Sequence, residues 1–197
     1  MHAMVALVVP LAVAVLTQIP ATSSGSGGRM PCGSCVAPTA VTAVADIAPE
    51  SEPGERMIIA GHVFGSDGRT ALAGVTLFLY QTDATGHYNA KDDPFQPRLH
   101  GWVRTDKTGQ YEFHTVKPGP YPGKRIPAHI HVHIFGPVIQ ERFLDDFNFL
   151  GDPLLTAEQN KSSSVDGTFS HVVSLERGSD GTLRGTRDIR VPSVNGK

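Results

Sequence analysis

The stretch AHIHVHIF, residues 128–135, has a histidine at every second position from 129 to 133, with apolar residues between and around them. In a β-strand, successive side chains point to opposite faces of the sheet. The pattern therefore predicts a strand that packs Ile130, Val132 and Ile134 on one face and presents three imidazoles on the other. The X-Pro step at residues 126–127 favours extended backbone at the entry to this strand.

The rest of the chain repeats short apolar segments separated by turn residues. Its 21 glycines and 15 prolines interrupt the sequence too often for long helices. The other expected strands span residues 57–64, 74–82, 101–105, 110–116, 142–149, 171–176 and 181–191. Turn-forming segments such as GSDGRT and TDKTGQ lie between most of them. We therefore expect an all-β fold, a sandwich or partly closed barrel, with one short helix at residues 154–161.

Length and charge restrict the number of domains and the partners. A chain of 197 residues with 40% hydrophobic content is long enough for one well-filled core, so one domain is expected. The formal net charge is −2 and no long basic run is present, which argues against nucleic acid or an anionic membrane surface as a partner. The expected partners are small molecules or proteins.

The N-terminus has the composition of an export signal. An apolar run at residues 4–16 is too short and too interrupted by proline to span a bilayer, and small polar residues follow it. The triplet at residues 21–23 provides a cleavage site of small residues. We expect residues 1–28 to be a signal peptide or disordered, and the protein to be exported to the periplasm or outside the cell without a stable membrane span after cleavage.

Two cysteines, Cys32 and Cys35, lie in a segment expected at residues 29–53, ahead of a domain expected at residues 54–193. In an exported protein their spacing favours a small local disulfide loop. A thioredoxin-like motif would need a following helix, and the residues after Cys35 are poor helix formers. Two thiolates alone also make an incomplete zinc site.

The alternating histidines His129, His131 and His133 are candidate metal ligands. Two imidazoles at positions i and i+2 of one strand can chelate one ion, and imidazole suits Zn, Cu and Fe. A solvated polar strand face is the alternative explanation of the same pattern. The segment at residues 83–100 shows no strand pattern, and loops of this length are commonly functional.

Several motifs together resemble the intradiol ring-cleavage dioxygenases, the catechol and protocatechuate 3,4-dioxygenase family. They are GHYNAKDD (86–93), KPGPYP (117–122), PAHIH (127–131) and FLGDPL (149–154). The resemblance runs from about residue 54 to residue 191, and the CGSC segment is similar to the exported branch of the family. It implies a β-sandwich of two mostly antiparallel sheets, transthyretin-like, with long loops and little helix.

The resemblance also implies a metal site, because this family holds one ferric ion with two tyrosines and two histidines. The motif matches assign that role to Tyr88, Tyr121, His129 and His131, with one Fe(III) per chain. Independently, two phenolates are hard anionic donors that favour Fe(III), and coordination lowers the pKa of a phenol. The implied reaction uses O2 to cleave a catechol between its two hydroxylated carbons, giving a cis,cis-muconate, with Tyr121 as a base.

Other residues beside these motifs receive supporting roles from the resemblance. The family places an Arg three residues before the first metal histidine, where this chain has Ile126, so the adjacent Arg125 is the candidate for that catalytic cation. Asp146 aligns with a glutamine close to the metal. The remaining candidates for the surroundings of the metal or the pocket are His133, His87 and His100.

Two other functions fit parts of the sequence. Residues 58–83 and 105–121 also match the generic pattern of non-catalytic β-sandwich binding modules of the transthyretin-like or carboxypeptidase-regulatory-like kind. Alternatively, the three histidines alone bind Cu or Zn, which would make both tyrosines dispensable. The sequence does not name the catechol substrate, and it leaves a homo-oligomer open.

Overall fold

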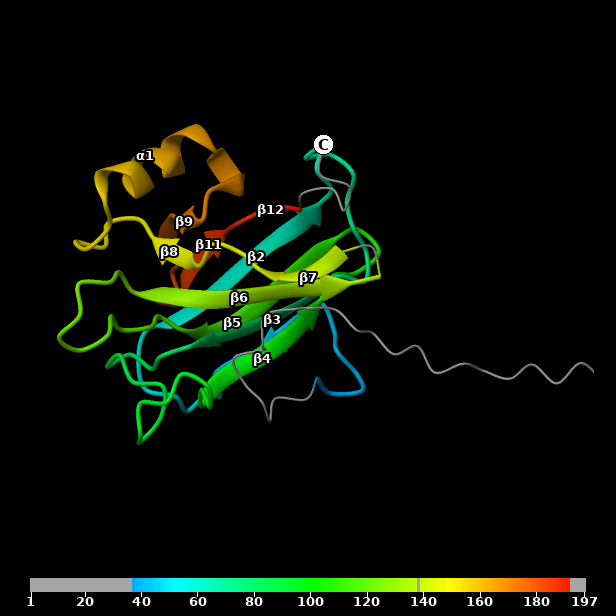
Figure 1. The fold of residues 1–197 in the computed structure, drawn as a ribbon. Coiled ribbons are helices and arrows are strands. Elements are labelled where there is room, and N and C mark those ends of the chain that lie inside the picture. Colours follow the sequence, from blue (N-terminus) through cyan, green and yellow to red (C-terminus); the bar gives the residue numbers. More distant parts are fainter. Residues whose placement is uncertain (1–36, 138, 192–197) are drawn as a thin grey trace, which may run out of the picture.

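The computed structural model of the chain describes residues 37–137 and 139–191, which form an almost entirely β-stranded domain (Figure 1). The predicted signal peptide and the predicted disulfide between Cys32 and Cys35 lie outside the described residues. Within the described ranges, no helix has the length and apolar character needed to cross a bilayer.

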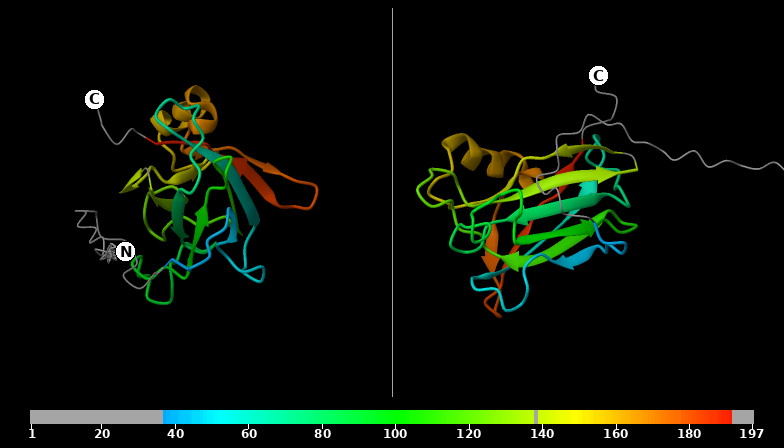
Figure 2. Two further views of the ribbon diagram at one scale, coloured as in Figure 1. Left: turned by 90° about the vertical axis from the view of Figure 1, so that its right-hand side faces the viewer. Right: turned by 60° about the horizontal axis from the view of Figure 1, so that its bottom comes forward.

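The strands form two sheets. The first has the order β1 (Val44–Asp46), β5 (Gln110–Val116), β2 (Arg56–Phe64), β11 (Leu183–Thr186) and β10 (Leu175–Arg177), and β12 (Ile189–Arg190) also pairs with β2. The second has the order β4 (Leu99–Arg104), β3 (Thr76–Gln81), β6 (His129–Gly136), β8 (Phe147–Phe149) and β9 (Val172–Val173), and β7 (Ile139–Phe143) pairs with β6. Helix α1 (Ala157–Val165) and the 3-10 turn η1 (Gly167–Phe169) lie beside β9 (Figures 1 and 2).

The prediction of an all-β sandwich of two mostly antiparallel sheets is confirmed, and a minority of parallel pairs makes both sheets mixed. The long central pairs, β2 with β5 and β3 with both β4 and β6, are antiparallel. Four pairs of short strands are parallel: β1 with β5, β11 with β2, β12 with β2, and β8 with β9. Because β1 belongs to the first sheet, that sheet begins ahead of the boundary predicted at residue 54.

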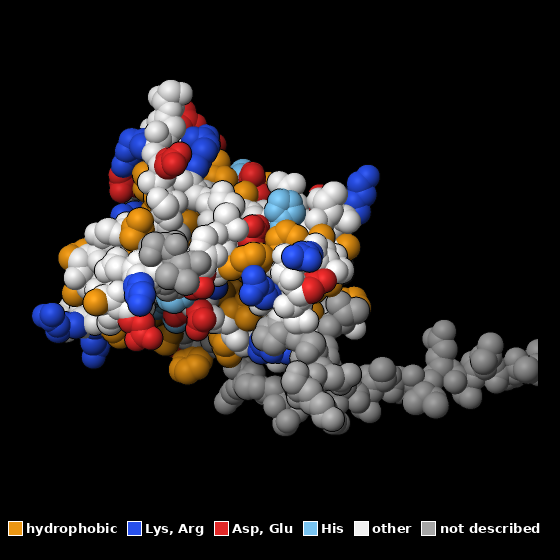
Figure 3. Space-filling view, turned by 90° about the horizontal axis from the view of Figure 1, so that it is seen from above, with side chains coloured by type: hydrophobic (Ala, Val, Ile, Leu, Met, Phe, Trp, Pro, Cys, Tyr) orange, Lys and Arg blue, Asp and Glu red, His pale blue; other side chains and the backbone are white. Residues whose placement is uncertain are grey.

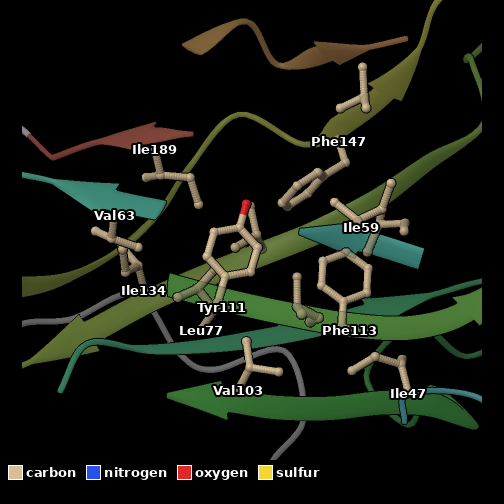
Figure 4. Packing of buried hydrophobic residues seen from close by; sticks show 14 of the residues in the cluster. Ile47, Ile59, Val63, Leu77, Val103, Tyr111, Phe113, Ile134, Phe147 and Ile189 are labelled. Carbon is tan, nitrogen blue, oxygen red and sulfur yellow. The ribbon is translucent and has the colours of Figure 1, made fainter. Parts of the chain in front are cut away.

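The core lies between the two sheets and follows the predicted alternation of side chains (Figure 4). On β2, Ile59 and Val63 are fully buried and alternate with partly exposed residues. On β6, Ile130, Val132 and Ile134 are fully buried in the same core. The apolar face of AHIHVHIF is therefore packed as predicted, and its histidines lie on the face directed away from the core.

Three predicted strands are divided. The segment predicted as one strand at 142–149 contributes to β7 and β8, because residues 144–146 leave the sheet between them. The segment at 171–176 is split between β9 and β10, which lie in different sheets. The segment at 181–191 is interrupted at Arg187, whose backbone crosses β2 so closely that a Cβ on Gly61 would lie 1.7 Å from the Arg187 carbonyl oxygen.

The predicted helix at 154–161 is present but begins later, at Ala157. Its start is set by a capping box, a reciprocal pair of hydrogen bonds. The Gln159 N–H donates to Thr156 Oγ1 (3.2 Å), and the Thr156 N–H donates to Gln159 Oε1 (2.9 Å). The sequence TAEQ carries this signal, so the first helical residue follows Thr156.

The outer face of the second sheet, directed away from the core, carries an aromatic cluster. Phe78 and Tyr80 of β3 and Tyr88 of the following loop are buried there, and Trp102, Tyr121 and Phe135 pack against them. This cluster explains why β3 is buried on both faces. The face seen in Figure 3 intersperses acidic, basic and hydrophobic side chains, and the mixture of charges is in keeping with the small net charge.

Candidate metal centre

Two loops carry Tyr88 and Tyr121 onto the outer face of the second sheet, and glycines let these loops touch. Gly86 has a φ of +91°, and a Cβ there would lie 2.1 Å from the Pro120 carbonyl oxygen. A Cβ on Gly119 would lie 2.6 Å from a backbone oxygen of the other loop. A glycine two residues before each tyrosine is therefore required by the close approach of the two backbones.

The loop of Tyr88 is also anchored by a buried carboxylate. The Arg98 N–H donates to the Tyr88 carbonyl (2.9 Å), and the Arg98 guanidinium binds Glu52 through two hydrogen bonds of 2.5 and 2.8 Å. These hydrogen bonds from Arg98 hold the pKa of the buried Glu52 carboxyl below its usual value. Asp92, with a left-handed φ of 55°, accepts the Tyr88 N–H (3.2 Å). The backbone of Tyr88 is thus fixed from both sides.

Strand β6 supplies His129 and His131 with both rings oriented by partners at Nδ1. The Nδ1–H of His129 donates to the Pro127 carbonyl (2.7 Å), and that of His131 donates to Asp146 Oδ1 (2.8 Å). The ring of Tyr80, which pairs with His131 in the sheet register, stacks on the His131 ring with centroids 4.4 Å apart. With the protons on Nδ1, both Nε2 atoms present lone pairs.

Four potential ligand atoms converge at one point. Tyr121 Oη lies 2.9 Å from His129 Nε2 and 3.2 Å from His131 Nε2, and the two Nε2 atoms are 3.2 Å apart. Tyr88 Oη lies 2.9 Å from His131 Nε2 and is hydrogen-bonded to Tyr121 Oη. Ligands that each lie about 2.0–2.1 Å from one ion are about 2.9–3.4 Å apart. The distances between the phenol oxygens and the imidazole nitrogens, and between the two nitrogens, fit a shared ion, and a cation would relieve the repulsion between the two facing Nε2 lone pairs.

Burial favours the neutral forms of both phenols and of the His129 imidazole. Burial raises the pKa of the Tyr88 and Tyr121 phenols, and burial lowers the pKa of His129. The site therefore offers an uncharged His129 imidazole as a donor, whereas the phenols become anionic donors only when a strong cation opposes the effect of burial.

A small pocket of about 220 Å³ opens beside the two tyrosines. Its lining residues are Tyr88, Asp92, Pro94, Tyr121, Pro122 and Lys124. A wider hollow of about 810 Å³ lies elsewhere, on residues of β2, β5 and β11, and includes none of the converging side chains. Of these two pockets, the smaller one is therefore the one beside the four converging ligand atoms.

Of the supporting residues predicted from the sequence, only Asp146 contacts the cluster directly, through His131. His87 is exposed and faces the pocket residue Asp92 (3.5 Å). Arg125 is exposed, makes no hydrogen bond or ion pair within the described part of the chain, and is adjacent to Lys124, which lines the pocket.

His133 and His100 lie apart from the cluster. His133 is 1% exposed, packs against Phe143 with ring centroids 4.6 Å apart, and has Nε2 3.6 Å from Glu141. His100 packs against Trp102 and binds the Pro97 carbonyl through Nδ1 (2.7 Å). The three alternating histidines therefore do not meet at one point, which removes the geometric basis of a three-histidine copper or zinc site.

The sequence did not reveal three residues that shape the site: Tyr80, Glu52 and Lys124. Tyr80 lies in an apolar stretch typical of a core strand, and it is buried, but its ring covers His131. Its role depends on the register of β3 against β6, which the sequence does not state. Glu52 and Lys124 carry no signal in sequence beyond their charge.

Comparison with known proteins gives a consistent set of matches. A family model described as "Dioxygenase" matches residues 31–186. The protocatechuate 3,4-dioxygenase beta chain of Burkholderia cepacia is 35% identical over 113 residues, which is 52% of this chain and 48% of that protein. Catechol 1,2-dioxygenase 2 of Acinetobacter lwoffii is 31% identical over 124 residues, 53% of this chain and 44% of that protein. The chain thus spans about half the length of these curated relatives.

Solved structures share the fold at lower sequence identity. The dioxygenase domain of a dioxygenase carbohydrate-binding protein fusion from Streptomyces sp. SirexAA-E superposes with a TM-score of 0.59 at 22% identity, covering 82% of this chain and 96% of that chain. The intradiol ring-cleavage dioxygenase from Tetranychus urticae superposes with a TM-score of 0.59 at 19% identity, covering 81% of this chain and 91% of that chain. At these identities the likeness concerns the fold.

Proposed function

The chain belongs to the intradiol ring-cleavage dioxygenase family, and from this premise we propose that it is an enzyme that binds one Fe(III) and cleaves a catechol-type aromatic with O2. The observation that carries this proposal is the convergence of two phenol oxygens and two imidazole nitrogens at the spacing of ligands around one ion. The proposed ligands are Tyr88, Tyr121, His129 and His131.

The donor set favours a trivalent ion. Imidazole alone suits Zn, Cu and Fe alike, so the two histidines do not select the metal. Phenolates are hard anionic donors, and burial has raised the pKa of both phenols. An ion of high charge is needed to ionise them at neutral pH, which supports Fe(III) over a divalent metal.

Bound Fe(III) would supply a Lewis acid that orients both catechol oxygens and raises their acidity. Tyr121 is partly exposed whereas Tyr88 is 4% exposed, and both line the pocket. Tyr121 is therefore the phenol better placed to accept a proton from an entering catechol hydroxyl, while Tyr88 and the histidines hold the metal. Cleavage between the two hydroxylated carbons places both atoms of O2 in a cis,cis-muconate-type product.

The pocket suits a small aromatic substrate. Its volume of about 220 Å³ lies below the roughly 300–1,000 Å³ of pockets for drug-sized ligands, so it matches one substituted ring. Pro94 and Pro122 give it apolar walls. Lys124 lines the pocket, and its neighbour Arg125 is the proposed catalytic cation, so positive charge is available for an anionic ring.

The test is to load the purified protein with iron, record its visible spectrum, and add catechol under air. We expect a tyrosinate-to-Fe(III) charge-transfer band that shifts on addition of catechol, equimolar uptake of O2, and a muconate-type product. His131→Phe should abolish the colour and the O2 uptake. The matched control is His133→Phe, which changes the next histidine on the same strand face, outside the cluster, and should preserve both.

Two results would contradict the proposal. A colourless protein that retains zinc in preference to iron would exclude the ferric site. A coloured protein that takes up no O2 with catechol, protocatechuate or hydroxyquinol would exclude the dioxygenase activity while leaving the metal site in place.

A further inference from the structure

The two histidines of the cluster have unlike partners at Nδ1. His129 donates to the Pro127 backbone carbonyl, which is a neutral acceptor, at 2.7 Å. His131 donates to a carboxylate oxygen of Asp146 at 2.8 Å. A hydrogen bond to an ionised acceptor is roughly twice as strong as one between neutral groups, so the two imidazoles are electronically inequivalent.

The position of Asp146 follows from the break between β7 and β8. Strand β8 pairs with β6 so that Ile130 faces Phe147, which puts the residue before Phe147 beside His131. Residues 144–146 leave the sheet here, and this departure frees the Asp146 side chain to reach Nδ1 of His131. On the ring face, Tyr80 stacks at 4.4 Å. Asp146 thus fixes the direction of the His131 ring through Nδ1, and Tyr80 covers the face of the ring.

Asp146 acts through His131 instead of binding an ion itself. One ligand atom from each of His129, His131 and Asp146 lies within 4.8 Å of the others, a distance that by itself would admit a third protein ligand. However, Asp146 Oδ1 is bonded to the Nδ1 side of the imidazole, and the point of convergence is on the Nε2 side, toward Tyr121. The carboxylate therefore lies behind the ring.

We propose that Asp146 is a positioning residue that makes His131 the stronger of the two imidazole donors to the metal, an inference that rests on the function proposed above. A carboxylate that accepts the Nδ1 proton increases the negative charge at Nε2 and holds the ring in its ligating orientation. His131 then donates more electron density to the metal. The site therefore holds a ferric ion more firmly, and the ion accepts charge from the tyrosinates less readily. The resemblance drawn from the sequence places a neutral glutamine at this position, where this chain has a carboxylate.

The test compares Asp146→Asn with Asp145→Asn in the iron-loaded full chain. Both variants remove one carboxylate with little change of shape, but Asp145 is exposed and makes no contact with His131. We expect Asp146→Asn to move the visible band to longer wavelength and to speed the loss of iron to excess chelator by about 10–100-fold. Asp145→Asn should leave both readouts at wild-type values.

The outcomes separate this inference from the proposed function. A band present and identical in the wild type and both variants, with equal rates of iron loss, overturns the role of Asp146 and leaves the ferric site intact. Absence of the band from the wild type overturns the ferric site and this inference with it. Should Asp146→Asn fail to fold, Asp146→Glu takes its place. Because that variant keeps the charge but moves it by one methylene, its band must lie at longer wavelength than in the wild type.

Discussion

Replacing Arg98 by Ala should destabilise the protein and loosen the loop that carries Tyr88. Arg98 is the partner of Glu52, whose side chain is 5% exposed, and its backbone N–H holds the Tyr88 carbonyl. Without the guanidinium, Glu52 keeps its burial but loses both hydrogen bonds. Removing one partner of a fully buried pair costs about 3–5 kcal/mol.

The expected cost here is smaller, because Arg98 is 47% exposed and water can partly replace it. We expect about 1–3 kcal/mol, the usual cost of leaving a buried polar group without its partner. The matched control is Arg177→Ala, which breaks the ion pair with Glu55, where both side chains are about half exposed. Exposed ion pairs contribute about 0–1 kcal/mol to stability. The free energy of unfolding of the control should therefore be close to that of the wild type.

Urea denaturation of the iron-free proteins measures these free energies of unfolding, and the pH dependence gives a second check. The pKa of Glu52 is lowered by Arg98, so the stabilisation by this pair is present above the ordinary value of 4.5 and is lost as pH falls through the lower native value. The cost of Arg98→Ala should therefore be largest at neutral pH and shrink in acid. Equal costs for Arg98→Ala and Arg177→Ala at neutral pH would refute the anchoring of the Tyr88 loop by Glu52.

Three further predictions concern the loops, the core and the metal. Gly86→Ala should lower the free energy of unfolding in urea by about 2–5 kcal/mol, because Gly86 has a positive φ and a Cβ there would overlap Pro120. The control Gly123→Ala, at a positive φ with open space around it, should lower it by about 1–2 kcal/mol. Burial lowers the pKa of His133, so on acidification the unfolded chain takes up a proton at this residue before the folded protein does, and stability falls. His133→Phe should therefore reduce the loss of stability between about pH 7 and pH 5. An unchanged loss of stability over this range would refute this. Iron affinity, from chelator competition, should fall as pH falls, since two phenols must lose protons; a pH-independent affinity would contradict phenolate ligation.

The sequence predicted the parts of the site that depend on local periodicity and motif spacing. Alternation along residues 128–135 is enough to put His129 and His131 on one face of a strand, because side chains in a strand alternate whatever the strand packs against. The motifs around Tyr88 and Tyr121 identified both phenols, and the structure brings them to the same two imidazoles.

Long-range register and the ends of strands were beyond the sequence. The stacking of Tyr80 on His131 depends on how β3 pairs with β6, and a shift of one residue would turn Tyr80 to the other face. The segment at 142–149 has the composition of a single strand, yet β7 ends at Phe143 and β8 begins at Phe147, and the side chain of Asp146 between them binds His131. Local composition contains neither constraint.

The four donors divide into a pair on one strand and a pair on two loops, and this division sets how each responds to change. His129 and His131 stand two residues apart on a strand whose other face is packed in the core, so any displacement of β6 moves both imidazoles together. The phenols lie on two loops that touch at Gly86 and Pro120, and the loop of Tyr88 has a second anchor at Glu52. Substitutions in the loops should therefore change the metal–phenolate bonds without displacing β6, and the tyrosinate charge-transfer band should report them even where the histidine pair is undisturbed.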